Sequence, residues 1–315
     1  MSATSGADRR AQSFVVDARE AGARIDVFLA ARLGVGRSAA RALLEAGAVR
    51  VDGRPLGRRH KGVSVGLGSR VEVAGFAAPA AQRARPEPEL PLAVLARGPG
   101  WLAVDKPPGR PVHPLRPEES GTLLNALIAR HPEVHGVGEG GLRSGVVHRL
   151  DVDTSGVLLF ATEAEAWERL RAAFRAHRVE KVYRALVHGR MVGEGALEVE
   201  LAVVRHRPAR VAVQDPARAR GKDRLAGLRW RALAHGSAVT LLEVRPRTGF
   251  LHQIRATLAH LDHPVCGDPI YGDASGVPRQ MLHASRLAVD EVLAESPDPP
   301  DFAEACARLV RAAPW

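Results

Sequence analysis

Cysteine is almost absent from this chain of 315 residues, which contains only Cys266 and Cys306. Neither belongs to a C-x-x-C pair, so the pattern excludes a zinc ribbon and the disulfide scaffold of a small secreted domain. A reducing compartment is therefore expected.

Long apolar segments are also missing. The first residues, MSATSGADRRAQS, lack the apolar segment of a signal peptide, and the sequence contains no run of about 18 apolar residues. The sequence thus predicts a cytoplasmic location and no membrane partner.

Acidic residues are outnumbered by basic ones: 35 Asp and Glu against 45 Lys and Arg give a net charge of +10. A basic chain favours an anionic partner, with nucleic acid as the leading candidate. An arginine- and alanine-rich composition that reflects GC-biased coding would produce the same balance, and charge alone does not separate the two. The length accommodates one large domain and one small one.

Residues 14–76 have the pattern of a small α/β module. Apolar residues recur at helical spacing from Ile25 to Leu33. Ser38 stands where it would cap a second helix, which would end at Gly47.

The second half of this module alternates apolar and polar residues, which predicts short strands at residues 49–51 and within residues 63–73, with a turn at Asp52-Gly53. Basic residues are concentrated around these elements. They are Arg37, Arg41, Arg50, Arg54, Arg58, Arg59, His60 and Lys61. Single basic side chains are usually only solvated, but so many in a short span favour a contact with nucleic acid.

A stretch rich in proline and alanine, residues 77–91, has no apolar periodicity and is predicted to be a linker. The pattern from Leu92 onward mixes helical and strand segments. Residues 92–315 are therefore expected to form one domain.

The segment HRLDVDTSG, residues 148–156, places one carboxylate, Asp151, after a basic pair and before a turn. The apolar run VLLFA that follows is predicted to be a buried strand, and residues 163–177 a helix with one apolar face. The next segment, EKVYRALVHG, alternates as a strand does, so Tyr183, one of only two tyrosines, is expected on a strand.

Two other segments have simple interpretations. The turn Lys106-Pro107-Pro108-Gly109, which ends the short strand LAVD, is interpreted as a hairpin corner. The glycines of residues 136–145 lack the spacing and the following helix of a dinucleotide-binding loop, which excludes that function.

The last dense segment is TGFLHQIRATLAHLDHPVCGDPIYGD. A strand, LLEVRP, leads through a turn into a helix that begins near His252. Arg255 would lie in the first turn of this helix and point back across the preceding loop. His260, Asp262 and His263 have the chemistry of metal ligands, but no separate fourth ligand is evident, so a helix end is favoured and no metal is predicted.

The residues thus offer one prominent aspartate, a tyrosine and an arginine, without a cofactor motif. Such a carboxylate acts as an acid, a base or a nucleophile. Glycosidic bonds are normally hydrolysed by two carboxylates, and the spacing does not settle whether Asp153 is a partner of Asp151. A nucleosidase or glycosidase stays open as an alternative.

Two groups of motifs resemble known families. ARIDVFLAARL, GRSAARALLEAG and AVRVDG resemble an S4-like RNA-binding domain, whose pattern is R-x-D-x-F-L, a helix rich in Ser and Arg, and G-x-V-x-V-(D/N)-G. KPPGRPVHP, HRLDVDTSGVLLFAT, KVYRALVHG, HQIRATLAHLDHPVCGDPIYGD and LHASRL resemble the blocks of the RluA-type pseudouridine synthases over residues 92–290. An S4-like domain at the front is typical of members that act on large-subunit ribosomal RNA.

The resemblance implies an α+β fold, with a mixed, largely antiparallel sheet in the catalytic domain after a small α/β S4-like domain. It implies the isomerisation of uridine to pseudouridine, in which the bond from uracil N1 to ribose breaks and the base is rejoined through C5, without cofactor or metal. The expected partner is structured RNA, ribosomal RNA before transfer RNA, and the expected state is a monomer.

The resemblance also implies roles for single residues. Asp151 matches the catalytic aspartate, which attacks the ribose or removes a ribose proton. Tyr183 matches the tyrosine that stacks on uracil and helps to remove the C5 proton, and Arg255 matches the arginine that pairs with the aspartate and favours its charged form. Substrate-binding positions are expected at Arg149, His252 and Leu282, and in the S4-like module at Arg37, Arg41, Arg50 and Arg54.

One segment departs from the family pattern G-R-T-H-Q-(I/L)-R, because Phe250 and Leu251 replace the arginine and the threonine. Two polar contacts, to RNA or to a neighbouring loop, are expected to be lost. A second hypothesis is therefore a non-catalytic RNA-binding or ribosome-assembly protein descended from such an enzyme. The presence of Asp151, Tyr183 and Arg255 favours catalysis.

Overall fold

The computed structural model describes residues 11–76, 82–206, 208–214 and 224–310. The chain forms two compact units, whose main boundary falls between Ala84 and Arg85. Residues 77–81 of the predicted linker lie outside the described residues. In the parts of the chain that are described, no helix has the length and apolar character needed to cross a membrane.

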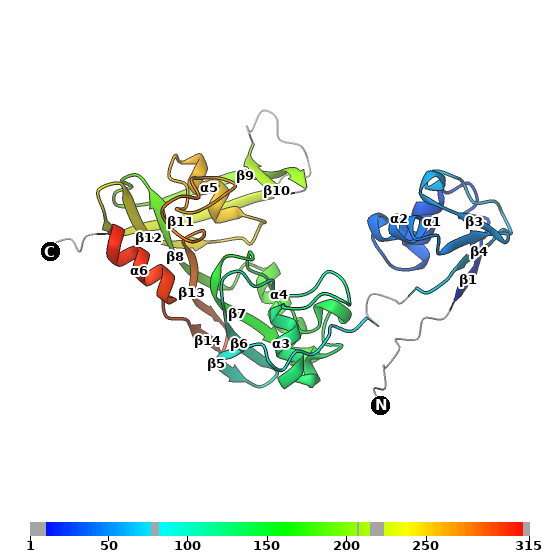
Figure 1. Cartoon of the computed structure of the whole chain (residues 1–315), viewed down its shortest axis with the longest axis horizontal. Helices are drawn as coiled ribbons and strands as arrows, with labels where there is room; N and C mark the ends of the chain where they lie inside the picture. Colours follow the sequence, from blue (N-terminus) through cyan, green and yellow to red (C-terminus); the bar gives the residue numbers. More distant parts are fainter. Residues whose placement is uncertain (1–10, 77–81, 207, 215–223, 311–315) are drawn as a thin grey trace. The chain divides into compact units, whose positions relative to one another are not determined.

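The N-terminal unit combines a four-stranded antiparallel sheet, in the order β1-β4-β2-β3, with two short helices (Figure 1). Its elements are β1 (Gln12–Val15), α1 (Ile25–Arg32), α2 (Arg37–Glu45), β2 (Val49–Val51), β3 (Arg54–Leu56), the 3-10 helix η1 (Arg58–His60) and β4 (Arg70–Val73). Ile25, Phe28 and Leu29 of α1 and Leu44 of α2 pack into one core with the sheet.

Two local predictions for this unit have different outcomes. Asp52 and Gly53, with φ of 48° and 77°, form the predicted turn between β2 and β3, and a tight hairpin requires this positive φ. The N-cap position predicted at Ser38 is wrong, because α2 begins at Arg37 with Gly36 as its N-cap. The side chain of Ser38 lies outside the described part of the chain.

The larger unit is built on a ten-stranded sheet with the order β10-β9-β11-β12-β8-β13-β7-β6-β5, and β14 pairs with β13. Its strands are β5 (Ala93–Gly98), β6 (Trp101–Lys106), β7 (Ser155–Ala161), β8 (Glu180–His188), β9 (Glu194–His206), β10 (Ala209–Val213), β11 (Arg224–His235), β12 (Val239–Pro246), β13 (Leu282–Val289) and β14 (Val292–Glu295). Its helices are α3 (Leu123–Arg130), η3 (Pro132–Val134), η4 (Gly141–Arg143), α4 (Ala164–Arg175), α5 (Gln253–His260) and α6 (Pro300–Leu309). Among the described strands β7 and β13 run parallel and the other pairs antiparallel, which confirms the predicted fold class.

Gly156 makes the parallel junction of β7 and β13 possible. Its φ is +110°, and a Cβ at this position would lie 2.1 Å from the carbonyl oxygen of Ala284. A side chain is therefore excluded by both the backbone conformation and the space. Ser155 pairs with His283 in the same register, so the junction fixes the strand directly after the loop that carries Asp151.

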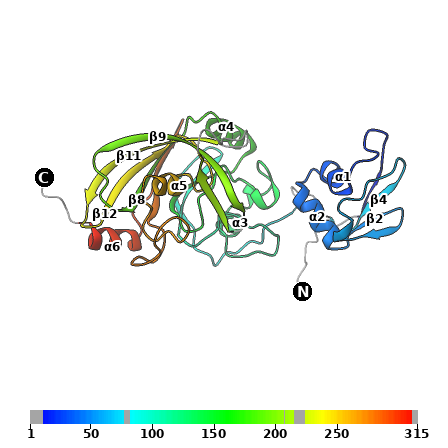
Figure 2. The same ribbon diagram turned by 90° about the horizontal axis from the view of Figure 1, so that it is seen from above.

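Three helices cover the large sheet and extend its core. Leu170 of α4 packs in a cluster with residues of β7, and Leu258 of α5 packs with residues of β8 and β12. Phe302 of α6 is fully buried with Leu186 of β8, and α6 lies beside β8 and β12 in both views (Figures 1 and 2).

Candidate active site

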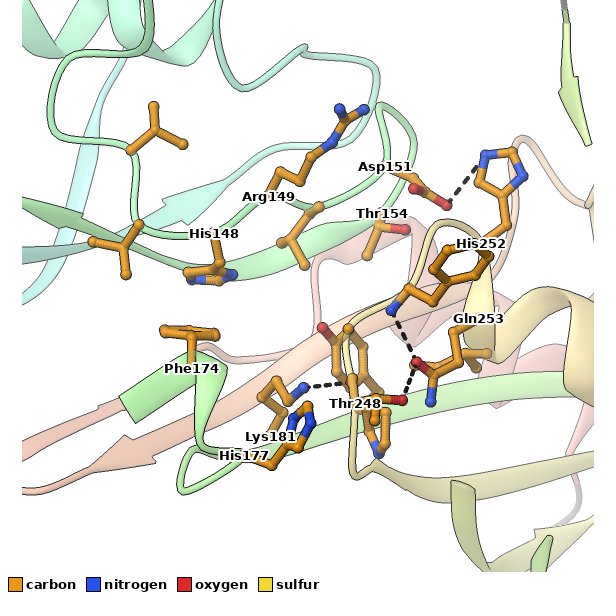
Figure 3. Close-up of a pocket in the computed structure, with 18 of the residues that line it drawn as sticks. His148, Arg149, Asp151, Thr154, Phe174, His177, Lys181, Thr248, His252 and Gln253 are labelled. Atoms are coloured by element: carbon orange, nitrogen blue, oxygen red, sulfur yellow. Dashed lines mark hydrogen bonds and ion pairs between the residues drawn. The ribbon is translucent and has the colours of Figure 1, made fainter. Parts of the chain in front are cut away.

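A cavity of about 480 Å³ opens where the loop before β7, the end of α4, β8, the turn before α5 and β13 meet (Figure 3). It is lined by every site residue that the sequence predicts for this unit. These are Arg149, Asp151, Tyr183, His252, Arg255 and Leu282. The fold therefore brings together blocks that lie far apart in the sequence.

Asp151 is held through one of its two carboxylate oxygens. Nη1 of Arg255, 104 positions along the chain, donates to Oδ2 at 2.8 Å, and Nε2 of His252 lies 3.9 Å from the same oxygen. Among the described residues, Oδ1 takes part in no hydrogen bond or ion pair. Because Asp151 also lines the cavity, Oδ1 is the oxygen available to a bound molecule.

Arg255 is itself fixed by a second carboxylate, Asp268. Nε and Nη2 of the guanidinium donate to the two oxygens of Asp268 at 2.7 and 2.8 Å. Burial opposes the charge on Asp268, but the guanidinium and the N–H groups of Ile270 and Tyr271 hold its pKa below the usual value. This two-bond pair with Asp268 uses Nε and Nη2 and leaves Nη1 free to reach Asp151, which accounts for the orientation of Arg255.

Tyr183 lies on β8 with Ala284 of β13 and Val244 of β12 as register neighbours. Burial, together with the charge of Asp151, raises the pKa of its phenol well above the ordinary value. The phenol is therefore neutral over the physiological range. No group in the described part of the chain hydrogen-bonds to its hydroxyl.

The loop that carries Asp151 is anchored from the end of β6 by Lys106. Nζ of this fully buried lysine donates to the carbonyl oxygens of Val152 and Pro107 at 2.6 and 2.8 Å. Burial lowers the pKa of Lys106 to about 7, and the nearby charge of Asp153 opposes this shift. The segment interpreted as a hairpin corner thus carries a loop anchor.

A second anchor, Arg279, lies just before β13. Its guanidinium donates to the carbonyl oxygen of Asp153 at 3.1 Å, to Oγ of Ser155 at 3.2 Å and to the carbonyl oxygen of Leu282 at 3.3 Å. Nε and Nη2 also pair with Asp301 of α6 at 2.6 and 3.0 Å. One buried side chain therefore joins the loop, the cavity wall and the C-terminal helix.

His148, the first residue of the HRLD block, has a supporting position. Its Nε2 accepts a hydrogen bond from the backbone N–H of Leu159, and its ring stacks on Phe174 at 4.8 Å. Burial lowers the pKa of His148 to about 3, so the ring is neutral. Arg149 points its side chain to solvent at the cavity and contacts no acidic group of the described residues.

Sequence reasoning missed Lys106, Asp268, Arg279 and Asp301. A lysine between an apolar strand and a double proline is a signal that was available for Lys106. No local pattern distinguishes the other three, because Asp268 meets Arg255 only across 13 positions and Arg279 meets Asp301 across 22.

The four basic residues predicted to bind RNA in the N-terminal unit fall into two places. Arg37 and Arg41 approach the buried carboxylate of Asp26 at 3.4 and 2.9 Å, where Arg24, which the prediction omitted, also binds. Arg50 and Arg54 belong to β2 and β3, where Nη1 of Arg50 donates to the carbonyl oxygen of Gly53. Asp26 therefore fixes one group of these arginines and the hairpin carries the other.

His260, Asp262 and His263 do not form a metal site. Nδ1 of His263 is hydrogen-bonded to the carbonyl oxygen of His188 at 2.8 Å. Within the described ranges, no group of three His, Cys, Asp or Glu side chains is arranged to hold a metal ion.

Comparison with known proteins assigns the family. Residues 100–260 match the RNA pseudouridylate synthase family, and residues 23–67 match the S4 domain. The chain therefore belongs to the RNA pseudouridylate synthase family, and it is an RNA pseudouridine synthase that carries an S4 domain.

Three relatives illustrate the range of similarity. An uncharacterized RNA pseudouridine synthase of Chloroflexus aurantiacus is 40% identical over 59% of this chain and 57% of its own length. An uncharacterized RNA pseudouridine synthase of Mycobacterium bovis is 36% identical over 85% of this chain and 86% of its own length. The ribosomal large subunit pseudouridine synthase D of Pseudomonas aeruginosa is 32% identical, with 68% and 70% covered.

Solved structures share the fold. The human RNA pseudouridylate synthase domain containing 1 superposes with a TM-score of 0.56 at 26% identity, covering 68% of this chain and 87% of its own. The human RNA pseudouridylate synthase domain containing 4 gives the same TM-score at 23% identity, with 70% and 94% covered.

Proposed function

We propose that this protein isomerises specific uridines of large-subunit ribosomal RNA to pseudouridine, with Asp151 as the reacting group. The observation that carries the proposal is the asymmetric setting of this carboxylate. Oδ2 is bound by Arg255, while Oδ1 is free and belongs to a side chain that lines the cavity.

The chemistry follows from this setting. Oδ1 either attacks the ribose carbon that bears the base or removes a ribose proton, and the electrons of the broken bond stay on uracil N1. The base then turns and its C5 bonds to the ribose carbon, which breaks the bond to Oδ1 in the first route and is accompanied by return of the ribose proton from Oδ1 in the second. The C5 proton then leaves while N1 regains a proton. Arg255 offsets charge changes on Asp151 throughout.

Tyr183 contributes an aromatic face and a neutral hydroxyl. We expect the ring to stack on the uracil while the base turns, and the hydroxyl to assist removal of the C5 proton. The target uridine must be extruded from structured RNA to enter the cavity, at a cost of a few kcal/mol. All of these groups come from one chain, which supports action as a monomer.

Two features support ribosomal RNA as the substrate. The S4 domain presents arginines on α2 and on the β2–β3 hairpin, and Arg149 lies unpaired at the cavity among the described residues. Several relatives are described as ribosomal large subunit pseudouridine synthases. Transfer RNA is the alternative substrate.

Replacement of Asp151 tests the reaction. Asp151→Asn removes the reactive carboxylate with little change in volume, so isomerisation should be abolished while RNA affinity stays within a few-fold. Glu139→Gln, which removes an exposed carboxylate at the rim of the same cavity, is the matched control. Near-normal turnover of Asp151→Asn would exclude this residue as the catalytic group.

Pseudouridine mapping tests the substrate and the non-catalytic hypothesis together. Large-subunit ribosomal RNA and transfer RNA from cells with and without the gene would be compared. Loss of defined pseudouridines from the ribosomal RNA is expected, with restoration by the wild-type gene but not by the Asp151→Asn gene. Restoration by both genes would favour a non-catalytic role.

A further inference from the structure

We propose that His252 is a positioning residue whose Nε2–H is aimed at Oδ2 of Asp151, in a tautomer fixed by Tyr271. The proposal rests on the function proposed for Asp151. It assigns to His252 an effect on the reactive carboxylate rather than the RNA contact expected from the sequence.

The hydroxyl of Tyr271 determines where the proton of the imidazole lies. The backbone N–H of Val211 donates to the hydroxyl oxygen at 2.7 Å, and Nδ1 of His252 lies 3.1 Å from the same oxygen. If the hydroxyl donates to Nδ1, the N–H of Val211 and the hydroxyl proton of Tyr271 both have acceptors. The neutral ring then carries its own proton on Nε2.

The opposite tautomer is unfavourable on two grounds. It would leave the hydroxyl proton of Tyr271 without an acceptor among the described residues. It would also turn the lone pair of Nε2 toward Oδ2 of Asp151, 3.9 Å away, where two electron-rich atoms repel. The labelled side chains of His252 and Asp151 face each other in Figure 3, where a dashed line joins them.

The surroundings keep the ring neutral. Burial lowers the pKa of His252, with the charge of Asp151 opposing this shift and that of Arg255 adding to it. The charge of Asp268 likewise raises this pKa, and that of Arg149 lowers it. At neutral pH the ring is therefore the single-proton donor that the hydrogen bonds require.

The backbone at His252 is unusual for a helix N-cap. His252 precedes α5 with φ 51° and ψ 20°, a left-handed conformation that non-glycine residues seldom adopt. Its side chain makes no capping hydrogen bond. The imidazole is thus directed away from the helix end and contacts Tyr271 edge to face, with ring centroids 5.7 Å apart.

The consequence is that the carboxylate of Asp151 is oriented by groups that act on one of its two oxygens. Arg255 binds Oδ2 and the Nε2–H of His252 faces the same oxygen, so tilting of the carboxylate plane away from this arrangement is opposed. Oδ1 is then kept toward the substrate. At 3.9 Å this N–H acts on the carboxylate as an oriented dipole beyond hydrogen-bond distance, so its loss should slow the chemical step by at most about 10-fold, the lower end of the range for a hydrogen bond to a charged group.

Nitrogen NMR of the full chain labelled with ¹⁵N-histidine tests the tautomer without RNA. The signals of His252 are identified by their loss in His252→Gln. At pH 7 we expect Nε2 to be protonated and Nδ1 to be bare, and Tyr271→Phe should convert this pattern into a tautomer mixture. A protonated Nδ1 in the wild-type protein would overturn the proposal.

Single-turnover rates at saturating RNA, with transcribed large-subunit ribosomal RNA as the probe, test the positioning role. His252→Phe should lower the rate but leave the RNA dissociation constant within about twofold, and His252→Gln should restore part of the rate through its amide N–H. His260→Phe, an exposed position of the same helix, is the control. Equal rates for wild type and His252→Phe would refute the role, whereas inactivity of the wild type would refute the proposed substrate and leave the NMR result to decide the tautomer.

Discussion

Replacing Asp268 by asparagine should destabilise the larger unit and slow the reaction. The side chain is fully buried and accepts two hydrogen bonds from Arg255. Asparagine at this site can keep the bonds to Oδ1, but its NH₂ group would face the Nε–H of Arg255. Two donors would then oppose each other beside a buried cation that has lost one of its two negative partners.

The magnitude follows from the cost of breaking a buried pair, about 3–5 kcal/mol of unfolding free energy. For a unit of this size, such a loss lowers the thermal midpoint by roughly 6–20 °C. Arg255 would also lose the fork that orients Nη1 toward Asp151, so the single-turnover rate should fall by up to about 100-fold. Thermal denaturation and single-turnover assays on the full chain measure both effects.

The control for this change is Asp262→Asn, an exposed position in the same segment whose positive φ asparagine tolerates. The pKa of Asp268 is lowered in the folded state, so its stabilisation is complete above the ordinary carboxyl pKa and is lost as the pH falls through the lower folded-state value. Wild type should therefore lose more stability than Asp268→Asn below about pH 4. The reasoning would be refuted if the unfolding free energy of Asp268→Asn lay within about 1 kcal/mol of the wild-type value and fell as much as that of wild type below about pH 4.

Three further changes separate other parts of the molecule. Arg279→Lys should lower the single-turnover rate at saturating RNA by roughly 10- to 100-fold with little change in RNA affinity. The reason is that a lysine cannot keep both the pair with Asp301 and the contacts to the loop. An equal loss of RNA affinity would contradict this. Phe250→Arg should steepen the log–log salt dependence of RNA binding by about 0.7–0.9, whereas Leu251→Thr should not, because Phe250 lines the cavity and Leu251 packs outside it. Joint replacement of Arg37 and Arg41 by glutamine should flatten the same slope by up to roughly 1.4–1.8, and an unchanged slope would exclude phosphate contacts there.

Local features of the fold were predictable where a short pattern determines the outcome. The start of α5 beside His252 and the strand that carries Tyr183 follow from periodicity. The N-cap of α2 was not predicted correctly, because Gly36, two residues before Ser38, already adopts the extended conformation of an N-cap. A serine near a helix start indicates a cap only to within a turn.

The supporting contacts of the site were beyond sequence reasoning for a different reason. Arg279 reaches Ser155 across 124 positions, and Asp268 reaches Arg255 only because a turn returns the chain after α5. The contact of Arg279 also depends on the sheet order, which places β13 beside β7. Motifs identified the reacting groups, whereas the residues that orient them required the assembled sheet.

The clamp formed by Arg279 and Asp301 couples the C-terminal helix to catalysis. When α6 opens by local unfolding, Arg279 loses its ion pair and its hold on the loop of Asp151 is weakened. A helix packed on a sheet can open locally without breaking the strand pairs of the sheet. On heating, activity should therefore decline while the sheet is still intact, and amide hydrogen exchange in α6 would report the temperature at which the enzyme begins to inactivate.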